Sequence, residues 1–394
     1  MSEIKVNSIK GVAASTAAIT VNNTDGTCTA NITSVNGGQL GSRRININGA
    51  MAVSQRGTVT GITNNASKYG GADRLKNTVV NHGTYTASQE ADAPSGTGLT
   101  YSHKITTTSA DSSLASNARL YIQHRIEKQD LYNVKVGTSN AEQITVQFYV
   151  KGDKTGTYIL ELFDNVRNRH VSASYTISSA NTWEKKTITF PADTGGSAYD
   201  SSNPNSAGIE FNFWLAAGSA FTSGTLATTW TGNDDPQRVA GITVNVGDSG
   251  YWQITGLQIE IGSVATDFEF RSFAQELALC QRYYRVLLDN TGGIAQNTDF
   301  GMALYYTSTY LMWPVYCTPE MRATPTLDCT SGSNLYRFYR NNGYDSMDDF
   351  TFNNGTTRFV RIQNASDASG TAGQSGILHI SATTDAIIAL KAEL

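Results

Sequence analysis

The sequence of 394 residues predicts an all-β protein, and three observations support this fold class. Gly is abundant (36 residues), as are Ser, Thr and Asn, while charged residues make up only 16%, against a typical ~25%. Aromatic side chains are frequent, with 19 Tyr, 14 Phe and 5 Trp, whereas disordered chains are poor in them. Apolar and polar residues alternate with a period of two in many segments, which is typical of antiparallel strands with one buried face. In chain order we expect an N-terminal extended segment that anchors or trimerises the chain, a jelly-roll β-sandwich, a short connecting helix and a C-terminal β-sandwich.

Residues 1–41 differ from the rest of the chain. Their small apolar residues alternate only weakly, as at Ile19 and Val21, among small polar residues. They are too few for a separate core, and such strands persist only when they pair with another chain or dock on a partner. We interpret 1–41 as an anchoring, intertwined segment; a disordered tail is the alternative.

Residues 42–271 show the clearest strand pattern. Val146, Phe148 and Val150 alternate with polar neighbours, and a second alternating run covers 209–215. Many strands without intervening helical patterns indicate a two-sheet sandwich of the jelly-roll type.

Residues 272–288 break the strand pattern. Ser272 and Gln275 have the spacing of a capping box at a helix start. The apolar residues that follow are spaced 4, 3, 4 and 3 apart, a seam of two heptads, which is short for a coiled coil. The two interpretations left open are a helix that bridges two β domains and a helix that meets its symmetry mates on a trimer axis. The candidate interface residues are Phe273, Leu277, Cys280, Tyr284 and Leu287.

Residues 289–394 are expected to form a second β domain. Asn342-Gly343 and Asn354-Gly355 are typical hairpin turns. Strands are expected at 357–362, 377–382 and 386–390. About 105 residues suffice for one small sandwich.

The charge pattern argues against two classes of partner. The net charge is −4 and the basic residues are scattered, whereas nucleic-acid binding requires clustered Lys and Arg. No apolar run approaches the ~18 residues of a membrane span, and the start of the sequence lacks the apolar region of a signal peptide. We expect no nucleic-acid partner, no membrane insertion and no standard secretory export.

The cysteines do not suggest a metal site. Cys28, Cys280, Cys317 and Cys329 form no C-x-x-C pair and have no His at ligand spacing. We expect free buried thiols, with a Cys317–Cys329 disulfide as the alternative. The acidic runs at 233–235 and 345–349 offer oxygen ligands but lack the spacing of a calcium loop, so we expect no metal and no cofactor, with a loop-ordering Ca²⁺ at either run as the alternative.

The search for catalytic residues is mostly negative. Gly247-Asp248-Ser249-Gly250 is similar to the nucleophile segment of chymotrypsin-like proteases but is also ordinary turn chemistry. Glu210 and Glu260 are expected on outward strand faces as solvated charges, and the sequence selects no carboxylate pair of the kind that glycoside cleavage needs. We therefore expect a protein that is not an enzyme.

Aromatic residues are the one enriched chemical group. Two clusters lie in the C-terminal domain, and aromatic faces stack on the apolar faces of sugar rings. Packing in the core or at an interface is the alternative for each residue. The candidate glycan-binding residues are Tyr305, Tyr306, Tyr310, Trp313, Tyr336, Tyr339 and Tyr344.

Several segments together resemble bacteriophage tail-fibre and receptor-binding virion proteins, of the marine-phage type. Arg44–Gly57 (RININGAMAVSQRG) resembles an opening motif of that family, and Glu276–Tyr284 (ELALCQRYY) matches its helix motif closely. Leu75 stands where the family usually has Trp. The other matching segments are 2–7, 69–75, 257–272, 321–326 and 392–394.

This resemblance implies a virion fibre subunit, usually a homotrimer, with modules that resemble carbohydrate-binding domains. The expected partners are other phage tail or virion proteins, bound through residues 1–41, and a host-surface polysaccharide. The resemblance also implies assembly in the cytoplasm of the host bacterium and a place in the phage tail. A purely structural virion protein or a capsid-decorating fibre is the first alternative, and a polysaccharide depolymerase is the second.

Overall fold

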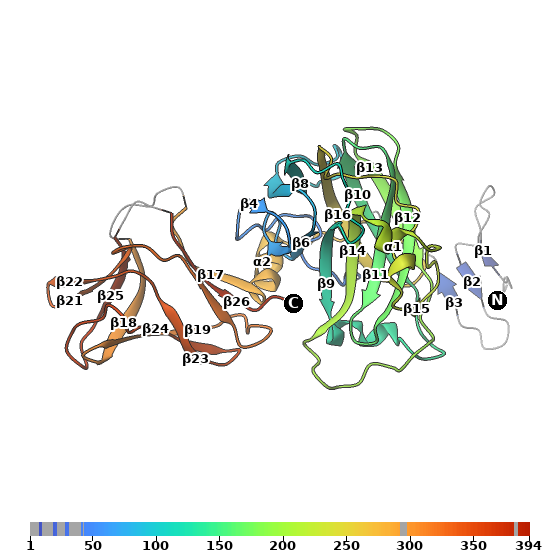
Figure 1. Cartoon of the computed structure of the whole chain (residues 1–394). Helices are drawn as coiled ribbons and strands as arrows, with labels where there is room; N and C mark the ends of the chain where they lie inside the picture. Colours follow the sequence, from blue (N-terminus) through green and yellow to red (C-terminus); the bar gives the residue numbers. More distant parts are fainter. Residues whose placement is uncertain are drawn as a thin grey trace, which may run out of the picture.

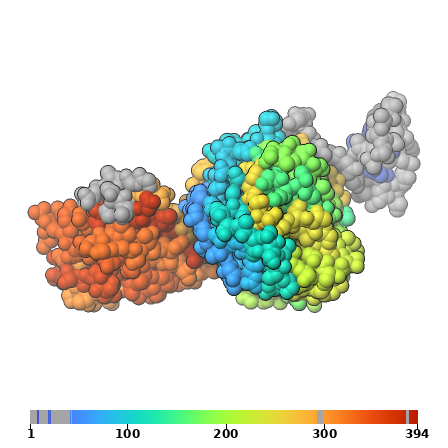
Figure 2. All heavy atoms as spheres, turned by 45° about the horizontal axis from the view of Figure 1, so that its top comes forward, coloured from blue at the N-terminus to red at the C-terminus, as the bar shows by residue number. Residues whose placement is uncertain are grey.

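The computed structural model describes residues 8–9, 19–21, 28–30, 41, 43–291, 298–381 and 385–394. Two β-sandwiches lie next to each other, with the helix α2 between them (Figure 1). Figure 2 shows them as two lobes joined by a narrower region. Every strand pairing described below is antiparallel, so the predicted all-β fold class is confirmed for these residues.

The described parts of the N-terminal segment form one small sheet. Its strands lie in the order β1 (Ser8–Ile9), β2 (Ile19–Val21) and β3 (Cys28–Ala30). They pair with one another within the chain. The interpretation that this segment intertwines with other copies stays a prediction.

The first sandwich is built from a six-stranded and a seven-stranded sheet. The six-stranded sheet has the order β13 (Glu184–Phe190), β10 (Ile144–Gly152), β16 (Tyr251–Ile261), β8 (Ser102–Ser109), β7 (Thr84–Glu90), β4 (Val59–Ile62). The seven-stranded sheet has the order β15 (Thr231–Gly232), β12 (Arg169–Ile177), β11 (Gly156–Asp164), β14 (Ala207–Ala217), β9 (Arg119–Glu127), β6 (Leu75–Val80), β5 (Ala66–Tyr69). Short helical turns connect some strands: η1 (Lys128–Val134), α1 (Ser219–Thr222) and η2 (Asp235–Gln237).

The alternating residues of the first sandwich point into one core, as predicted. Val146, Phe148 and Val150 on β10 are fully buried and belong to the same apolar cluster as Phe211 and Phe213 on β14. Phe148 meets Phe213 edge to face at 5.2 Å between ring centroids. The two sheets therefore pack face to face on side chains of alternate positions.

The prediction for two acidic residues is wrong. Glu210 and Glu260 are buried rather than solvated. Arg125 pairs with Glu210 at 2.7 Å, and Arg43 pairs with Glu260 at 3.3 Å. These ion pairs allow carboxylates to lie on covered strand faces, because a buried charge needs a partner.

Helix α2 (Phe273–Gln281) begins at the predicted capping box. The Ser272 hydroxyl accepts a hydrogen bond from the Gln275 amide, and the Gln275 side chain bonds back to the Ser272 amide. The helix ends at Gln281, earlier than expected, and the chain continues into strand β17 (Tyr284–Asp289). The predicted 272–288 helix is thus too long, and strand pairing of the C-terminal domain begins at Tyr284 rather than at residue 289.

The second sandwich joins a three-stranded sheet to a seven-stranded sheet. The small sheet has the order β17, β26 (Ile387–Lys391), β20 (Thr326–Cys329). The large sheet has the order β22 (Gly343–Met347), β21 (Tyr336–Arg340), β25 (Ser375–Ile380), β18 (Asp299–Thr307), β19 (Tyr310–Tyr316), β24 (Phe359–Asn364), β23 (Thr351–Gly355). The three strands expected in this domain are confirmed to within two residues at each end. The predicted Asn354-Gly355 turn is wrong, since both residues lie at the end of β23.

Buried ion pairs join the two sandwiches. Glu393, after the last strand, accepts hydrogen bonds from Arg56 at 2.9 Å and from Arg74 at 2.5 Å, both on the first sandwich. The Arg74 guanidinium also lies over the Tyr283 ring, 3.4 Å from its centroid. Arg322 donates to the carbonyl oxygens of Ala392 and Glu393, which holds this segment in place.

A second set of contacts fixes helix α2 and the two residues after it to the first sandwich. Arg282 donates to both oxygens of the buried Glu127, and the Tyr283 hydroxyl donates to the same carboxylate at 2.5 Å. Glu276 pairs with Arg44 and accepts from the Asn48 amide at 2.7 Å.

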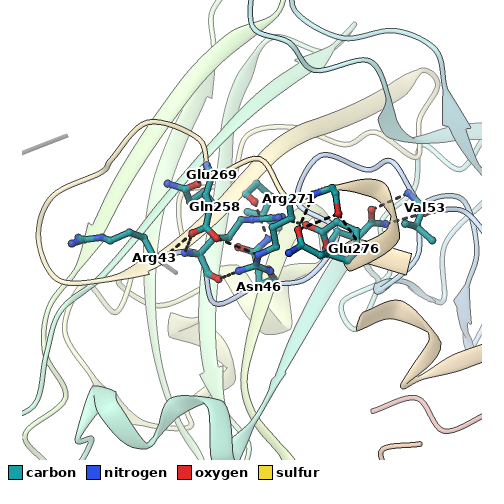
Figure 3. A network of polar contacts seen from close by, with 12 residues as sticks. Arg43, Asn46, Val53, Gln258, Glu269, Arg271 and Glu276 are labelled. Carbon is teal, nitrogen blue, oxygen red and sulfur yellow. Dashed lines mark hydrogen bonds and ion pairs between the residues drawn. The ribbon is translucent and has the colours of Figure 1, made fainter. Parts of the chain in front are cut away.

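The segment around Asn46 connects this helix to strand β16 (Figure 3). Asn46 donates to the Leu257 carbonyl and accepts from the Ile259 amide, at 2.8 and 2.9 Å. A Cβ at Gly49 would lie 2.0 Å from the Leu257 carbonyl oxygen, so only glycine fits there. Most segments that carry the family resemblance therefore meet at this junction, where they hold the domains together.

We predict that Glu393→Ala destabilises the protein by about 3–5 kcal/mol, because it leaves Arg74 buried without its charged partner. Chemical denaturation of the wild type and the variant measures the loss. Arg358→Ala is the control, since Arg358 pairs with Glu320 at an exposed site and should cost far less stability. Equal losses for the two variants would contradict the assignment of the junction.

Candidate functional site

Three of the seven predicted glycan-binding residues are core residues, so the prediction is wrong for them. Tyr305, Trp313 and Tyr336 are all 5% exposed or less. They belong to the apolar cluster between the two sheets of the second sandwich. The Tyr305 hydroxyl donates to Asp345 at 2.6 Å, and burial together with this carboxylate raises the pKa of Tyr305 to about 12. These side chains have no face open to a ligand.

The other four residues lie at the surface as two separate pairs. Tyr306 and Tyr310 flank the turn between β18 and β19, with ring centroids 5.8 Å apart. Tyr339 and Tyr344 flank the turn between β21 and β22, with centroids 5.0 Å apart. The sequence clusters therefore mix inward and outward residues.

The β21–β22 hairpin places its tyrosines side by side. Tyr339 and Tyr344 are direct cross-strand partners, and Arg340 pairs with Gly343. The two-residue turn between them is Asn341-Asn342, one position earlier than the predicted Asn342-Gly343 turn. Both turn residues have positive φ, of 50° and 61°, as a type I′ turn requires.

Charged side chains from three strands lie beside this tyrosine pair. His379 on β25 is the cross-strand partner of both Arg337 on β21 and Asp299 on β18. His379 Nδ1 lies 2.9 Å from an Asp299 carboxylate oxygen. The His379 ring lies edge-on to Tyr339, at 5.8 Å between centroids, and the Arg337 guanidinium lies 5.3 Å from the Tyr344 ring centroid.

We call Arg337, Tyr339, Tyr344, His379 and Asp299 the tyrosine surface. Tyr344 is 51% exposed and the Asp299 side chain 61%, Arg337 and Tyr339 are half-buried, and His379 is buried beneath them. The surface combines aromatic rings with a cation, an imidazole and a carboxylate, so it can stack on an apolar ring face and exchange hydrogen bonds around it. Its three charged or ionisable members were not predicted from the sequence, since only Arg337 stands near the tyrosines along the chain.

An apolar row continues from the tyrosine surface across the same sheet. Tyr344, Tyr339, Ile377 and Met302 are successive cross-strand partners on β22, β21, β25 and β18. Met302 is 70% exposed. The outer face of the large sheet therefore presents apolar side chains to solvent over four adjacent strands.

The five residues proposed for the trimer axis have different surroundings. Cys280 and Tyr284 are buried within the chain, and the Arg56 guanidinium lies 3.5 Å from the centroid of the Tyr284 ring. Tyr284 and Leu287 lie on strand β17, not on the helix. The helical seam is therefore wrong at these positions. Phe273 is exposed and Leu277 half-buried, so their contact with another copy stays a prediction.

The remaining candidates from the sequence are the cysteines and the segment 247–250. Cys280, Cys317 and Cys329 are free thiols, so the alternative of a Cys317–Cys329 disulfide is wrong. No three His, Cys, Asp or Glu side chains gather as metal ligands in the described part of the chain. Residues 247–250 lie in the turn region before β16. Among the residues that the structure describes, neither α1 nor α2 is long and apolar enough to cross a membrane.

The structural likenesses to known proteins described here are distant. No protein-family model and no curated protein matches the chain. The enzymatically active domain of tailspike protein 4 of bacteriophage CBA120 matches at 15% identity and a TM-score of 0.25, over 48% of this chain and 19% of that one.

Two carbohydrate-binding modules are similarly distant. A xylan-binding domain from Paenibacillus barcinonensis matches at 11% identity and a TM-score of 0.25, over 54% of this chain and 100% of that one. A family 11 module from Clostridium thermocellum, solved with a mixed-linked tetrasaccharide, matches at 10% identity and a TM-score of 0.26, over 54% and 99%. At these values the matches do not place the chain in a family, and their ligands are not transferred to it.

We predict that Tyr336→Ala and Tyr344→Ala have very different effects on stability. Removing the buried Tyr336 ring leaves a cavity and should cost about 3–5 kcal/mol, whereas the half-exposed Tyr344 should change stability by about 0.5 kcal/mol or less. Thermal and chemical unfolding of the two variants measures the difference. A large loss for Tyr344→Ala would show that this residue belongs to the core.

Proposed function

We propose that this chain is a subunit of a bacteriophage tail fibre that binds a glycan of the host surface and does not cleave it. In this proposal three copies assemble, residues 1–41 attach to other virion proteins, and the second sandwich points outward. The pair of half-buried Tyr339 and exposed Tyr344 beside Arg337, His379 and Asp299 is the observation that carries the proposal.

The chemistry of the tyrosine surface suits sugar rings. One face of a pyranose exposes C–H groups, which pack on aromatic rings, while its hydroxyl groups both donate and accept hydrogen bonds. The Arg337 guanidinium donates such bonds, and the exposed Asp299 carboxylate accepts them. A shallow site of this kind binds weakly, and three copies on one fibre raise the apparent affinity because the second and third contacts become intramolecular.

The junction between the sandwiches supports a role in attachment. Its buried ion pairs hold the second sandwich in one orientation on the first, so the tyrosine surface keeps a fixed direction relative to the first sandwich. The resemblance of the junction segments to tail-fibre proteins supports the proposed virion setting, with assembly in the host cytoplasm and a place in the phage tail.

The proposal predicts that Tyr339→Ala/Tyr344→Ala weakens glycan binding at least about tenfold, equivalent to ~1.4 kcal/mol. The purified full chain is applied to an array of bacterial surface polysaccharides, and the best ligand is titrated against each variant. Tyr132→Ala is the matched control, since Tyr132 is an exposed tyrosine of the first sandwich. Absence of binding to every polysaccharide, or equal binding by the double variant, would falsify the proposal.

Two further measurements address the assembly and the absence of cleavage. Light scattering of the full chain should give the mass of three copies; a monomer would contradict the trimer. Incubation with the bound polysaccharide should release no new reducing ends, whereas their appearance would favour a depolymerase.

A further inference from the structure

A small hollow lies on the outer face of the six-stranded sheet of the first sandwich, about 290 Å³ in volume. Strands β10, β13 and β16 form its floor, and the loop around residue 97 and the segment after β16 form its walls. Its lining residues are Gly96, Thr97, Leu99, Gln147, Tyr149, Lys185, Gly256, Asp267, Phe268 and Phe270. It belongs to a different domain from the tyrosine surface.

The hollow contains a buried polar group without a protein partner. Gln147 is only 2% exposed, and its amide nitrogen donates to the Thr266 carbonyl. Its Oε1 has no hydrogen-bond partner among the described residues. Rotating the amide by half a turn would not help, because Oε1 would then face the Thr266 carbonyl oxygen. Since buried carbonyl groups are nearly always hydrogen-bonded, Gln147 Oε1 offers an acceptor to a ligand in the hollow.

Aromatic rings line the same hollow. Tyr149 is half-buried, and Phe268 and Phe270 meet edge to face at 4.9 Å between centroids. Gly256 has φ +60°, and a Cβ there would lie 3.0 Å from the Tyr149 ring. Glycine at this position therefore leaves room for the ring of Tyr149 in the floor of the hollow.

The rim of the hollow has no net charge. Lys185 and Asp267 carry opposite charges and are both exposed. A strongly charged ligand would face one like charge on this rim, so the arrangement favours a neutral one. The volume of about 290 Å³ lies just below the roughly 300–1,000 Å³ of known ligand pockets, which suits a ligand of one ring.

From this geometry we propose that the hollow binds one neutral sugar ring. The apolar face of the ring packs on Tyr149 and Phe270, and one of its O–H or N–H groups donates to Gln147 Oε1. This site adds to the proposed function a second, monosaccharide-sized contact on the first sandwich.

The test is titration of the full chain with free glucose, galactose, mannose and N-acetylglucosamine, followed by saturation-transfer NMR. We expect saturable millimolar binding of at least one of them. Tyr149→Ala and Gln147→Met should each weaken it about tenfold. Met has a similar length to Gln and adapts to irregular spaces, and Gln258 still donates to the Thr266 carbonyl in that variant.

Tyr132→Ala serves as the matched control, because this exposed tyrosine lies on the same sandwich outside the hollow and should leave the titration unchanged. Unfolding curves check that each variant is folded. The inference is overturned if none of the four sugars binds saturably, or if the folded Tyr149→Ala chain binds as tightly as the wild type. The effect of Tyr339→Ala/Tyr344→Ala on array binding tests the tyrosine surface separately, so either site can fail while the other stands.

Discussion

The pairing of Glu393 with Arg56 and Arg74 is the interaction on which the arrangement of the two domains depends. An isolated charge in such a covered place is costly, but here the carboxylate meets two guanidinium groups, and one of them also stacks on Tyr283. Because the partners come from both sandwiches, their charges are neutralised only when the domains are correctly docked. The junction thus favours one relative orientation, which burial of apolar surface alone would specify less strictly.

The sequence predicted the architecture well wherever the signal was local. Alternation at 146–150 identified a strand and its buried face, and the capping box located the start of α2 at the correct residue. The end of α2 was missed because the apolar spacing continues through Tyr284 and Leu287, although these residues pair as a strand with β26. The pairing of β17 with β26, about 100 residues later in the chain, makes this segment a strand. A local sequence pattern contains no information about such a distant pairing.

The candidate site was predicted only in part, for a similar reason. Aromatic enrichment pointed to the correct domain, and four of seven tyrosine and tryptophan positions lie at the surface. Which of them face outward depends on the phase of the pleat, and one step along a strand reverses it. The polar half of the tyrosine surface comes from residues 299, 337 and 379, whose proximity follows from sheet order alone. Likewise, Gln147 is as buried as Gln123, Gln253 and Gln258 on other strands, and only its contacts in the folded chain leave its Oε1 without a partner.

The junction also has a consequence for the exchange of domains between related proteins. Arg56 and Arg74 belong to the first sandwich, while Glu393, Arg322 and Tyr283 belong to the second part of the chain. A recombination that replaced everything after the helix would keep a compatible contact only if the incoming module ended in a matching acidic residue at the same place. Chimeras with new distal modules are therefore restricted by a few residues at the junction between the sandwiches. The outer sheet face and its loops lie outside this junction and are free of that restriction.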